Sequence, residues 1–357
     1  MPQIRKEMPD VQLNRAQFEQ RYRQRFADPA FKPLEDALDR IIGVAWDAYD
    51  NGRKAPHTRK AGEGYADPSY DLSIDWIDAS RQIEEAERRQ KDLTSPPRIL
   101  LINGAARSEH TCPGEASKTF RLMKLARGVF DQEPGLEIEE LDLSRVTSEY
   151  GRNILPCKTC VSTAMPLCHW PCSCYPNHSL GQVHDWMNDI YPMWAAAHGV
   201  MILSPVNWYQ TPSVLKSMID RLVCADGGNP DPTSTHGKDA SRAKDIELAG
   251  WDFPRHLAGR AFSVVVHGDS AGAEAVQGAL TSWLGDMGLI AAGHQSQLAR
   301  YVGYMESYAA SHDALDNDSG FQEETRNAAH ALLEAVKLLR RGQLKQPDAK
   351  LREPRPK

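Results

Sequence analysis

The feature that most constrains the fold is a short apolar run at residues 99–102, which stops at Asn103 and Gly104. The run is too short for a helix and too continuous for a strand with one face in water. It therefore predicts a parallel strand buried on both faces. The residues that follow, up to Thr119, predict a polar loop and the start of a helix. Such a loop gathers free N–H groups at the positive end of a helix dipole, which predicts an anion-binding site.

Strand and helix patterns alternate from this point to the end of the chain. Further strands are expected at 136–143, 199–204 and 260–267, and a weaker fifth strand near 293–298. Apolar residues recur with helical spacing between or after these strands, which predicts helices at 116–130, 180–197, 213–223, 271–287 and 322–341. This alternation predicts an α/β fold with a doubly wound, mostly parallel sheet and helices on both faces. Ligands of such sheets bind at the carboxyl ends of the strands.

The two ends of the chain do not share this pattern. Residues 1–97 predict a helical extension without strands, since apolar positions recur with helical spacing at 34–45 and 73–92. The stretch 342–357 is rich in Pro, Lys and Arg, and predicts a disordered basic tail. We therefore expect the core domain to span 98–341.

Composition narrows the class of protein. A net charge of −6 and a pI near 6.1 argue against nucleic acid as a partner. No apolar run approaches the ~20 residues of a membrane span, and the first residues lack the apolar segment of a signal peptide. We expect a cytoplasmic protein with no membrane partner.

Three polar loops follow three of the expected strands. The first contains Arg107, Ser108, Ser117 and Thr119, which offer donors to a phosphate group. The second reads SPVNWYQTP at 204–212, and the helix after it reads LKSMIDRL at 215–222. The third reads HGDSAG at 267–272. Because the carboxyl ends of parallel strands meet at one edge of a sheet, we expect these loops to form one site.

The second loop and its helix resemble the NADPH-dependent FMN reductase family of flavodoxin-like folds, which has Ser-Pro-x-Tyr-x before Leu-Lys-x-x-Ile-Asp-Arg. The resemblance covers about residues 98–300. It implies a flavodoxin-like sheet of order 2-1-3-4-5, bound FMN, NAD(P)H as reductant, and a homodimer or homotetramer. Two positions depart from the family pattern, because Ala105 replaces the usual Ser and Asn207 the usual Tyr. No Gly-x-Gly-x-x-Gly follows a strand, which argues against a dinucleotide-binding Rossmann domain.

The resemblance implies that the first loop holds the FMN phosphate and the other two flank the ring. The residues expected to contact FMN are Arg107, Ser108, Ser117, Thr119, Pro205, Val206, Asn207, Trp208, His267, Gly268, Asp269 and Gly272. Pro205 fixes the backbone and Trp208 offers a flat apolar wall, although packing in the core or at a dimer contact is an alternative role for Trp208. Gly268 and Gly272 permit close approach of the backbone.

Five of the seven cysteines lie between residues 157 and 174. Such crowding in a reducing compartment indicates a metal, a cluster or reactive thiols rather than structural disulfides. The related iron–sulfur flavoproteins carry a compact cysteine motif in this region, which implies a [4Fe–4S] cluster on Cys157, Cys160, Cys168 and Cys172. Zinc and free thiols remain alternatives, because the spacing differs from the iron–sulfur pattern.

The expected function is an FMN-dependent NAD(P)H oxidoreductase that passes electrons to a quinone, flavin, aromatic or iron acceptor. No general acid or base is assigned, because the flavin supplies the chemistry in such enzymes. His267 either donates a proton at the mouth of the site or caps its strand. The alternatives are an iron–sulfur electron carrier and a non-catalytic flavin-binding protein. The polar loop at 224–238 is a lid over the flavin, an insertion at a subunit contact or a surface connection.

Overall fold

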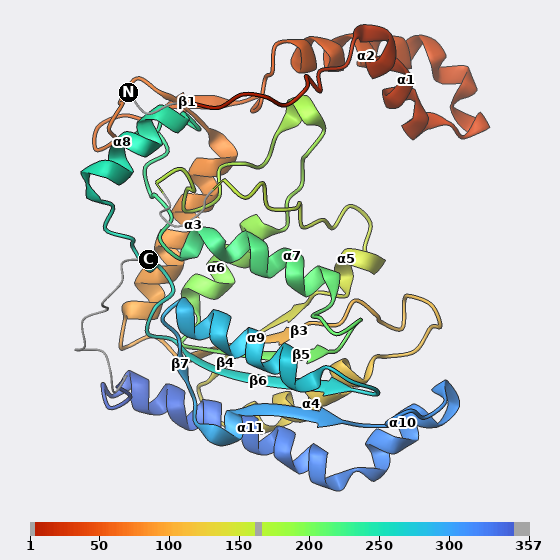
Figure 1. Cartoon of the computed structure of the whole chain (residues 1–357), viewed down its shortest axis with the longest axis vertical. Coiled ribbons are helices and arrows are strands. Elements are labelled where there is room, and N and C mark those ends of the chain that lie inside the picture. The colour runs from red at the N-terminus through yellow and green to blue at the C-terminus, as the bar shows by residue number, and fades with distance from the viewer. Residues whose placement is uncertain (1–3, 161–165, 346–357) are drawn as a thin grey trace.

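The computed structural model describes residues 4–160 and 166–345, and its centre is a six-stranded sheet (Figure 1). The strands are β3 (Arg98–Asn103), β4 (Glu137–Asp142), β5 (Gly199–Pro205), β6 (Ala261–Gly268), β7 (Ile290–Ala291) and β8 (Gln297–Tyr301). They are parallel and run in the order β4-β3-β5-β6-β7, with β8 also paired to β6. This order confirms the predicted flavodoxin-like, doubly wound sheet.

The expected fifth strand is divided into two. β7 pairs with the start of β6, and β8 pairs with its second half. A short 3-10 helix, η5 (His294–Ser296), lies between them. The range expected for this strand, 293–298, therefore ends too early in the sequence, because β8 continues to Tyr301. The segment after Gln297 leads to the carboxyl edge of the sheet.

Helices cover both faces of the sheet, as the alternation predicts. Figure 1 shows α4 (Lys118–Phe130) and α11 (Ser319–Arg340) below the sheet, and α6 (Met187–Ala196), α7 (Ser213–Arg221) and α9 (Ala273–Asp286) above it. The two faces of β3 explain this arrangement. Ile99 and Leu101 join the apolar cluster of α4 and α11, whereas Leu100 and Ile102 join that of α6, α7 and α9. Successive side chains of a strand point to opposite faces, so a fully apolar strand needs helices on both sides.

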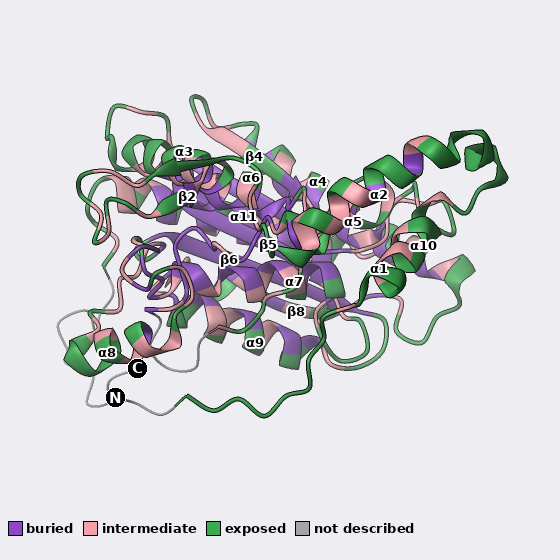
Figure 2. Cartoon of the chain, turned by 90° about the horizontal axis from the view of Figure 1, so that it is seen from above, coloured by how far each residue is buried: buried purple, intermediate pink, exposed green. Residues whose placement is uncertain are grey.

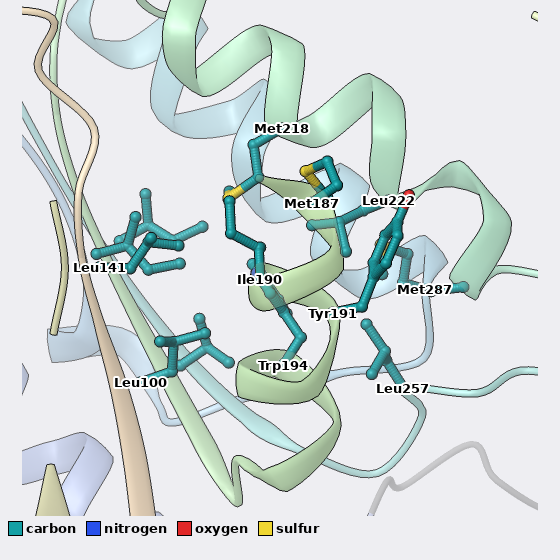
Figure 3. Close-up of a cluster of buried hydrophobic side chains, with 14 of the residues drawn as sticks. Leu100, Leu141, Met187, Ile190, Tyr191, Trp194, Met218, Leu222, Leu257 and Met287 are labelled. Carbon is teal, nitrogen blue, oxygen red and sulfur yellow. The ribbon is translucent and has the colours of Figure 1, made fainter. Parts of the chain in front are cut away.

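The core on the α6 side is the cluster drawn in Figure 3. Leu100 and Leu141 of the sheet face Ile190 and Trp194 of α6, and Met218 comes from α7. All of these side chains are at most 1% exposed. Figure 2 shows a similar contrast over the chain, since the central strands β3, β5 and β6 are buried while α1 (Arg15–Arg23) and α2 (Glu35–Asp50) are largely exposed.

The N-terminal region contains the expected helices α2 and α3 (Ile74–Lys91), but the prediction that it holds no strand is wrong. β1 (Thr58–Lys60) and β2 (Asp71–Ser73) pair antiparallel. Every residue of β1 is exposed, so the sequence offers no apolar alternation to indicate a strand.

The remaining elements are short or lie between the strand–helix repeats. They are α5 (Arg145–Ser148), α8 (Ala240–Gly250), α10 (Tyr308–Asn317), η1 (Gln24–Phe26), η2 (Pro29–Leu34), η3 (His178–Leu180) and η4 (Leu222–Ala225). Of the tail expected at 342–357, residues 346–357 lie outside the described part of the chain. Within the described residues, no helix combines the length and hydrophobicity needed to span a membrane.

Segments outside the strand–helix repeats pack on one another, and we refer to residues 54–76, 153–160, 166–185 and 226–258 as the added layer. Polar contacts join its parts. The His178 N–H donates to Lys54 O at 2.8 Å, and Trp76 Nε1 donates to Pro171 O at 2.9 Å. His169 Nε2 lies 2.8 Å from Thr235 Oγ1. The layer thus connects the N-terminal region to the segments before α6 and after α7.

Candidate functional site

The loops that follow β3, β5, β6 and β8 lie side by side at the carboxyl edge of the sheet. Backbone hydrogen bonds show this directly: Gly104 N–H donates to Leu203 O at 2.8 Å, and Val206 N–H donates to His267 O at 2.9 Å. On the other side of β6, Val302 N–H donates to Gly268 O at 2.9 Å. The structure therefore brings the three predicted loops together and adds a fourth, the segment 301–308.

The first loop ends in a capped helix. Ser117 is the N-cap of α4, and its hydroxyl accepts from Phe120 N–H at 3.1 Å. The guanidinium of Arg107 lies 5.4 Å from the Tyr308 ring centroid and pairs with Glu115 at 3.2 Å. Arg107 Nε is buried and has no hydrogen-bond partner. A hydrogen bond from Tyr308, with His312 and Arg107 nearby, keeps the pKa of Glu115 below its usual value.

A cavity of about 140 Å³ opens on this loop. Its lining residues are Asn103, Arg107, Ser108, Glu109, His110, Ala116, Ser117, Phe120, Asp142 and Ser144. The volume is below the roughly 300–1,000 Å³ of a pocket for a whole small molecule, so it suits one polar group of a larger ligand. Three of the four residues predicted to hold the phosphate, Arg107, Ser108 and Ser117, line it.

The fourth predicted phosphate contact, Thr119, lies elsewhere. It is fully buried, and its Oγ1 is 2.8 Å from Nε2 of His267, a buried residue near the end of β6. Burial, with smaller contributions from the charges of Lys118 and His312, lowers the pKa of His267 to about 3. His267 is therefore neutral at physiological pH, and the two predicted residues contact each other.

The second loop contains a tight turn. Asn207 and Gln210 exchange two backbone hydrogen bonds of 2.9 Å, which leaves Trp208 and Tyr209 as the two central residues. Their φ angles are +46° and +63°, a conformation that usually requires Gly or Asn in a two-residue hairpin. Holding a non-glycine residue there costs on the order of 1–3 kcal/mol, and such strain concentrates at functional sites. Trp208 is 94% exposed, which excludes the alternative that it packs in the core of this chain.

The third loop lies against this turn and explains both of its glycines. A Cβ on Gly272 would lie 3.1 Å from Tyr209 Cα, and the φ of Gly272 is +100°. A Cβ on Gly268 would lie 3.4 Å from both Tyr301 and Val206. The backbones of the second and third loops therefore approach each other closely, because these glycines carry no side chain.

The segment 301–308 contains the residues at this edge that sequence reasoning missed. Tyr301 accepts a hydrogen bond from Ala273 N–H at 3.2 Å and donates to Glu274 at 2.6 Å, while Met305 N–H donates to the exposed Asp269 at 2.8 Å. Tyr304 and Tyr308 are 60% and 55% exposed. The tyrosines and the methionine of this segment could have indicated a site in the sequence. The fifth strand was expected near 293–298, however, so these residues were not placed at the carboxyl edge of the sheet.

A larger hollow of about 790 Å³ lies beside η3 and the start of α6. None of the predicted FMN contacts lines it, and its Arg152 already pairs with Glu149 and lies 4.6 Å from the Trp186 ring. We therefore place the candidate site at the carboxyl edge.

The cysteines predicted as metal ligands lie in the added layer. In the described residues, which include all seven cysteines, no three His, Cys, Asp or Glu side chains are placed to hold a metal ion. The [4Fe–4S] or zinc site expected on Cys157, Cys160, Cys168 and Cys172 is thus not supported. The sulfurs have other neighbours: Cys157 Sγ accepts from Thr159 N–H at 3.3 Å, and Cys160 Sγ lies 3.4 Å from Cys174 Sγ.

Several solved structures are similar to part of this chain at low sequence identity. RosB with a bound 8-demethyl-8-formylriboflavin-5'-phosphate intermediate is 15% identical with a TM-score of 0.47, over 70% of this chain and 82% of that chain. An oxidoreductase from Corynebacterium diphtheriae is 12% identical with a TM-score of 0.38, over 69% and 98%. The apo form of the NADH:FMN oxidoreductase EmoB is 14% identical with a TM-score of 0.36, over 73% and 97%. A comparison with curated protein sequences finds no significant match.

The family comparison covers the sheet and the site together. The model of the NADPH-dependent FMN reductase family matches residues 97–302, more than half of the 357 residues. The matched region begins just before β3, ends just after β8 and includes every residue predicted to contact FMN. The chain therefore belongs to the NADPH-dependent FMN reductase family and is an NAD(P)H-dependent FMN oxidoreductase.

Proposed function

We propose that this enzyme passes electrons from NAD(P)H, through FMN at the carboxyl edge of the sheet, to a planar aromatic acceptor of the quinone or free-flavin class. The observation that carries the proposal is the aromatic rim of the site. Trp208 and Tyr209 are 94% and 61% exposed, and the turn holds both at positive φ. Tyr304 and Tyr308 are exposed on the adjoining segment. Flat aromatic faces favour flat aromatic ligands over a compact hydrated ion.

The first loop supplies the phosphate site in this proposal. Arg107 Nε is a buried donor without a partner, and the cavity beside it is lined by Ser108 and Ser117. The first N–H groups of α4 have no acceptor within the helix, and the helix dipole favours an anion at this end. Because the Thr119 hydroxyl is engaged by His267, we assign Thr119 to positioning the loop rather than to holding the phosphate.

The second and third loops flank the ring. We assign to residues 205–208 the supply of backbone groups and an aromatic face, and to residues 268–272, which pack against Tyr209 and Val206, the supply of backbone beside them. Bound FMN supplies the hydride- and electron-transfer chemistry, and the chain supplies orientation and a shaped environment. His267 is buried and neutral, so we assign it no proton transfer.

We also propose that the enzyme forms a homodimer through α2. One side of this helix packs inward through Leu38 and Ile42, while its Ile41 and Val44 are 50% and 68% exposed, and Leu34, just before the helix, is 54% exposed. An exposed apolar stripe of this kind is typical of an interface. Sedimentation of the full-length protein at micromolar concentration tests the proposal, and a monomer would contradict it.

Steady-state oxidation of NADH and of NADPH by the FMN-loaded protein tests the acceptor class. The acceptor panel contains a quinone, free riboflavin, a nitroaromatic compound and ferric citrate. We expect turnover with the quinone or riboflavin, and a Trp208→Ala variant with kcat/KM for that acceptor about 2- to 10-fold lower, since an aromatic contact contributes about 0.5–1.5 kcal/mol. Leu248→Ala, which removes an exposed apolar side chain of α8, is the matched control.

Two outcomes would contradict the proposal in different ways. Turnover with ferric citrate alone would show that the acceptor class is wrong. Bound FMN without NAD(P)H oxidation by any acceptor would instead favour a non-catalytic flavin-binding protein.

A further inference from the structure

Two cysteine thiols meet inside the added layer. Cys160 Sγ lies 3.4 Å from Cys174 Sγ, with Cys160 half-buried and Cys174 6% exposed. The sequence motif Cys157-Lys158-Thr159-Cys160 suggests a pair of Cys157 with Cys160. In the structure these two sulfurs have different neighbours. Cys157 Sγ accepts a hydrogen bond from Thr159 N–H at 3.3 Å, and Thr159 has a φ of +48°. The sulfur found beside Cys160 is therefore one that is 14 residues away in the chain.

Two lysines from distant segments surround this pair. Lys238 Nζ lies 3.6 Å from Cys160 Sγ and donates to Leu167 O at 3.0 Å. Lys54 donates to Ser173 O, next to Cys174. The half-buried cation of Lys238 favours a thiolate on Cys160, because a nearby positive charge stabilises the charged form of an acid.

The thiols of Cys160, Cys172 and Cys168 differ in acidity. A hydrogen bond from Cys174, together with Lys238, outweighs burial and the nearby Cys172 and lowers the pKa of Cys160 to about 6. A hydrogen bond to Cys174 and burial raise the pKa of Cys172 well above its usual value, and burial does the same for Cys168. Cys160 therefore forms a thiolate more readily than Cys168 or Cys172, and the sulfur of Cys174 lies directly beside it.

We propose that Cys160 and Cys174 are a redox-active dithiol that closes to a disulfide by exchange with a small-molecule disulfide. The Cys160 thiolate attacks one sulfur of the small molecule and forms a mixed disulfide, and the first small thiolate leaves and takes up a proton. Cys174 then loses its proton and attacks the Cys160 sulfur, which expels the second small thiolate. The two protein thiols are oxidised, and one small disulfide is reduced to two thiols.

This dithiol is separate from the proposed flavin site. The flavin loops follow β3, β5 and β6, whereas the dithiol lies among segments of the added layer and takes its cations from Lys54 and Lys238. The proposal therefore does not depend on which acceptor FMN serves, and its chemistry needs no electrons from NAD(P)H.

Disulfide mapping of the full-length protein tests the proposal. The protein is equilibrated with mixtures of oxidised and reduced glutathione, its remaining thiols are blocked, and its peptides are identified by mass spectrometry. We expect a Cys160–Cys174 cross-link that dithiothreitol reverses and that Cys160→Ser and Cys174→Ser each abolish. The matched control is Cys112→Ser, which removes an exposed thiol and leaves the cross-link unchanged.

A rate measurement on the reduced protein supports the same test without removing either sulfur. The rate of Cys160 alkylation is expected to reach half of its maximum near pH 6, and Lys238→Met shifts this midpoint toward the ordinary thiol value of about 8.5. Lys32→Met, on the exposed η2 segment, leaves the midpoint unchanged. A Cys157–Cys160 or Cys172–Cys174 cross-link in the wild-type protein would overturn the proposal. So would seven free thiols in folded protein at the most oxidising glutathione ratio.

Discussion

The contacts within the sheet differ in kind from the contacts within the added layer. The strands β3, β5 and β6 are almost entirely buried, and their backbones pair in a continuous register with apolar helices on both faces. The added layer has few regular elements and relies on side chains that bond to distant backbone groups, such as Trp76 to Pro171 O and Lys238 to Leu167 O. The first region relies on paired backbones and burial, and the second adds specific polar contacts to buried side chains such as Trp170 and Tyr175. One is suited to carrying a flavin site, and the other places reactive side chains.

Arg221 connects these two regions. It lies at the end of α7, in the helix motif typical of the family, and its side chain is 1% exposed. It pairs with Asp185 at 2.5 Å, donates to Leu155 O at 2.8 Å and stacks 4.7 Å from the Tyr175 ring. A residue of the core thus organises three positions of the added layer.

Replacing this arginine should give the largest effect. Arg221→Met leaves the buried Asp185 carboxylate without its partner, so we expect the free energy of unfolding to fall by about 3–5 kcal/mol. Equilibrium unfolding in urea measures the change. The exposed Arg326→Met, which breaks a surface pair with Glu323, should stay within about 0.5 kcal/mol of wild type. Wild-type stability of the Arg221 variant would show that the two regions are held independently.

Removing the buried donor of the first loop should affect the flavin site alone. Arg107→Met is expected to weaken FMN binding by about 1.5–3 kcal/mol, the usual contribution of a charged hydrogen bond, which is roughly a 10- to 150-fold rise in Kd. Fluorescence titration of apoprotein with FMN measures it, with the exposed Arg81→Met as the control. Unchanged affinity would remove Arg107 from the phosphate site, and a slower Cys160 alkylation in the same variant would argue that the two sites are coupled.

A single carbon atom should test how tightly the core is packed. A Cβ on Gly199, at the start of β5, would lie 2.5 Å from Val336 Cγ2 of α11, so Gly199→Ala should destabilise the protein by about 1–3 kcal/mol. Gly128→Ala is the matched control, because Gly128 lies within α4 and nothing is within 4 Å of its added Cβ. Helix propensity should make that control neutral or more stable by up to about 1 kcal/mol. Equal stability of the two variants in urea would show that the α11–sheet contact yields easily.

The last prediction concerns the pH dependence of stability. The pKa of His267 is about 3 in the folded chain, chiefly because of burial, and near 6.5 when unfolded. The unfolded state therefore binds more protons below pH 6.5, and this histidine's contribution to stability is complete above that pH and is lost as pH falls toward 3. The expected slope is at most about 1.4 kcal/mol per pH unit. His267→Gln should flatten the urea midpoint profile between pH 4 and 6.5, whereas an unchanged profile would contradict the burial argument.

The sheet could be predicted from the sequence much better than the added layer. Apolar runs such as that of β3 and the helical spacing of α4 depend on local patterns, so the doubly wound parallel sheet and the position of the three loops followed from them. The strand order came from the family resemblance. The contacts of Arg221, Cys174 and Lys238 join residues far apart in the chain with no periodicity, and no local pattern announces them. For the same reason, cysteine crowding left a metal, a cluster or reactive thiols open, and the structure places Cys160 beside a sulfur that is distant in the sequence. Whether the predicted loop residues contact FMN stays a prediction.

The exposed turn at Trp208 has a practical consequence. The other tryptophans of the chain are buried or half-buried, so the indole of this turn is the one most open to water. Its emission should be the reddest of the set and the first to respond when a ring settles against it. The protein thereby carries its own optical probe of ligand arrival, readable without any label.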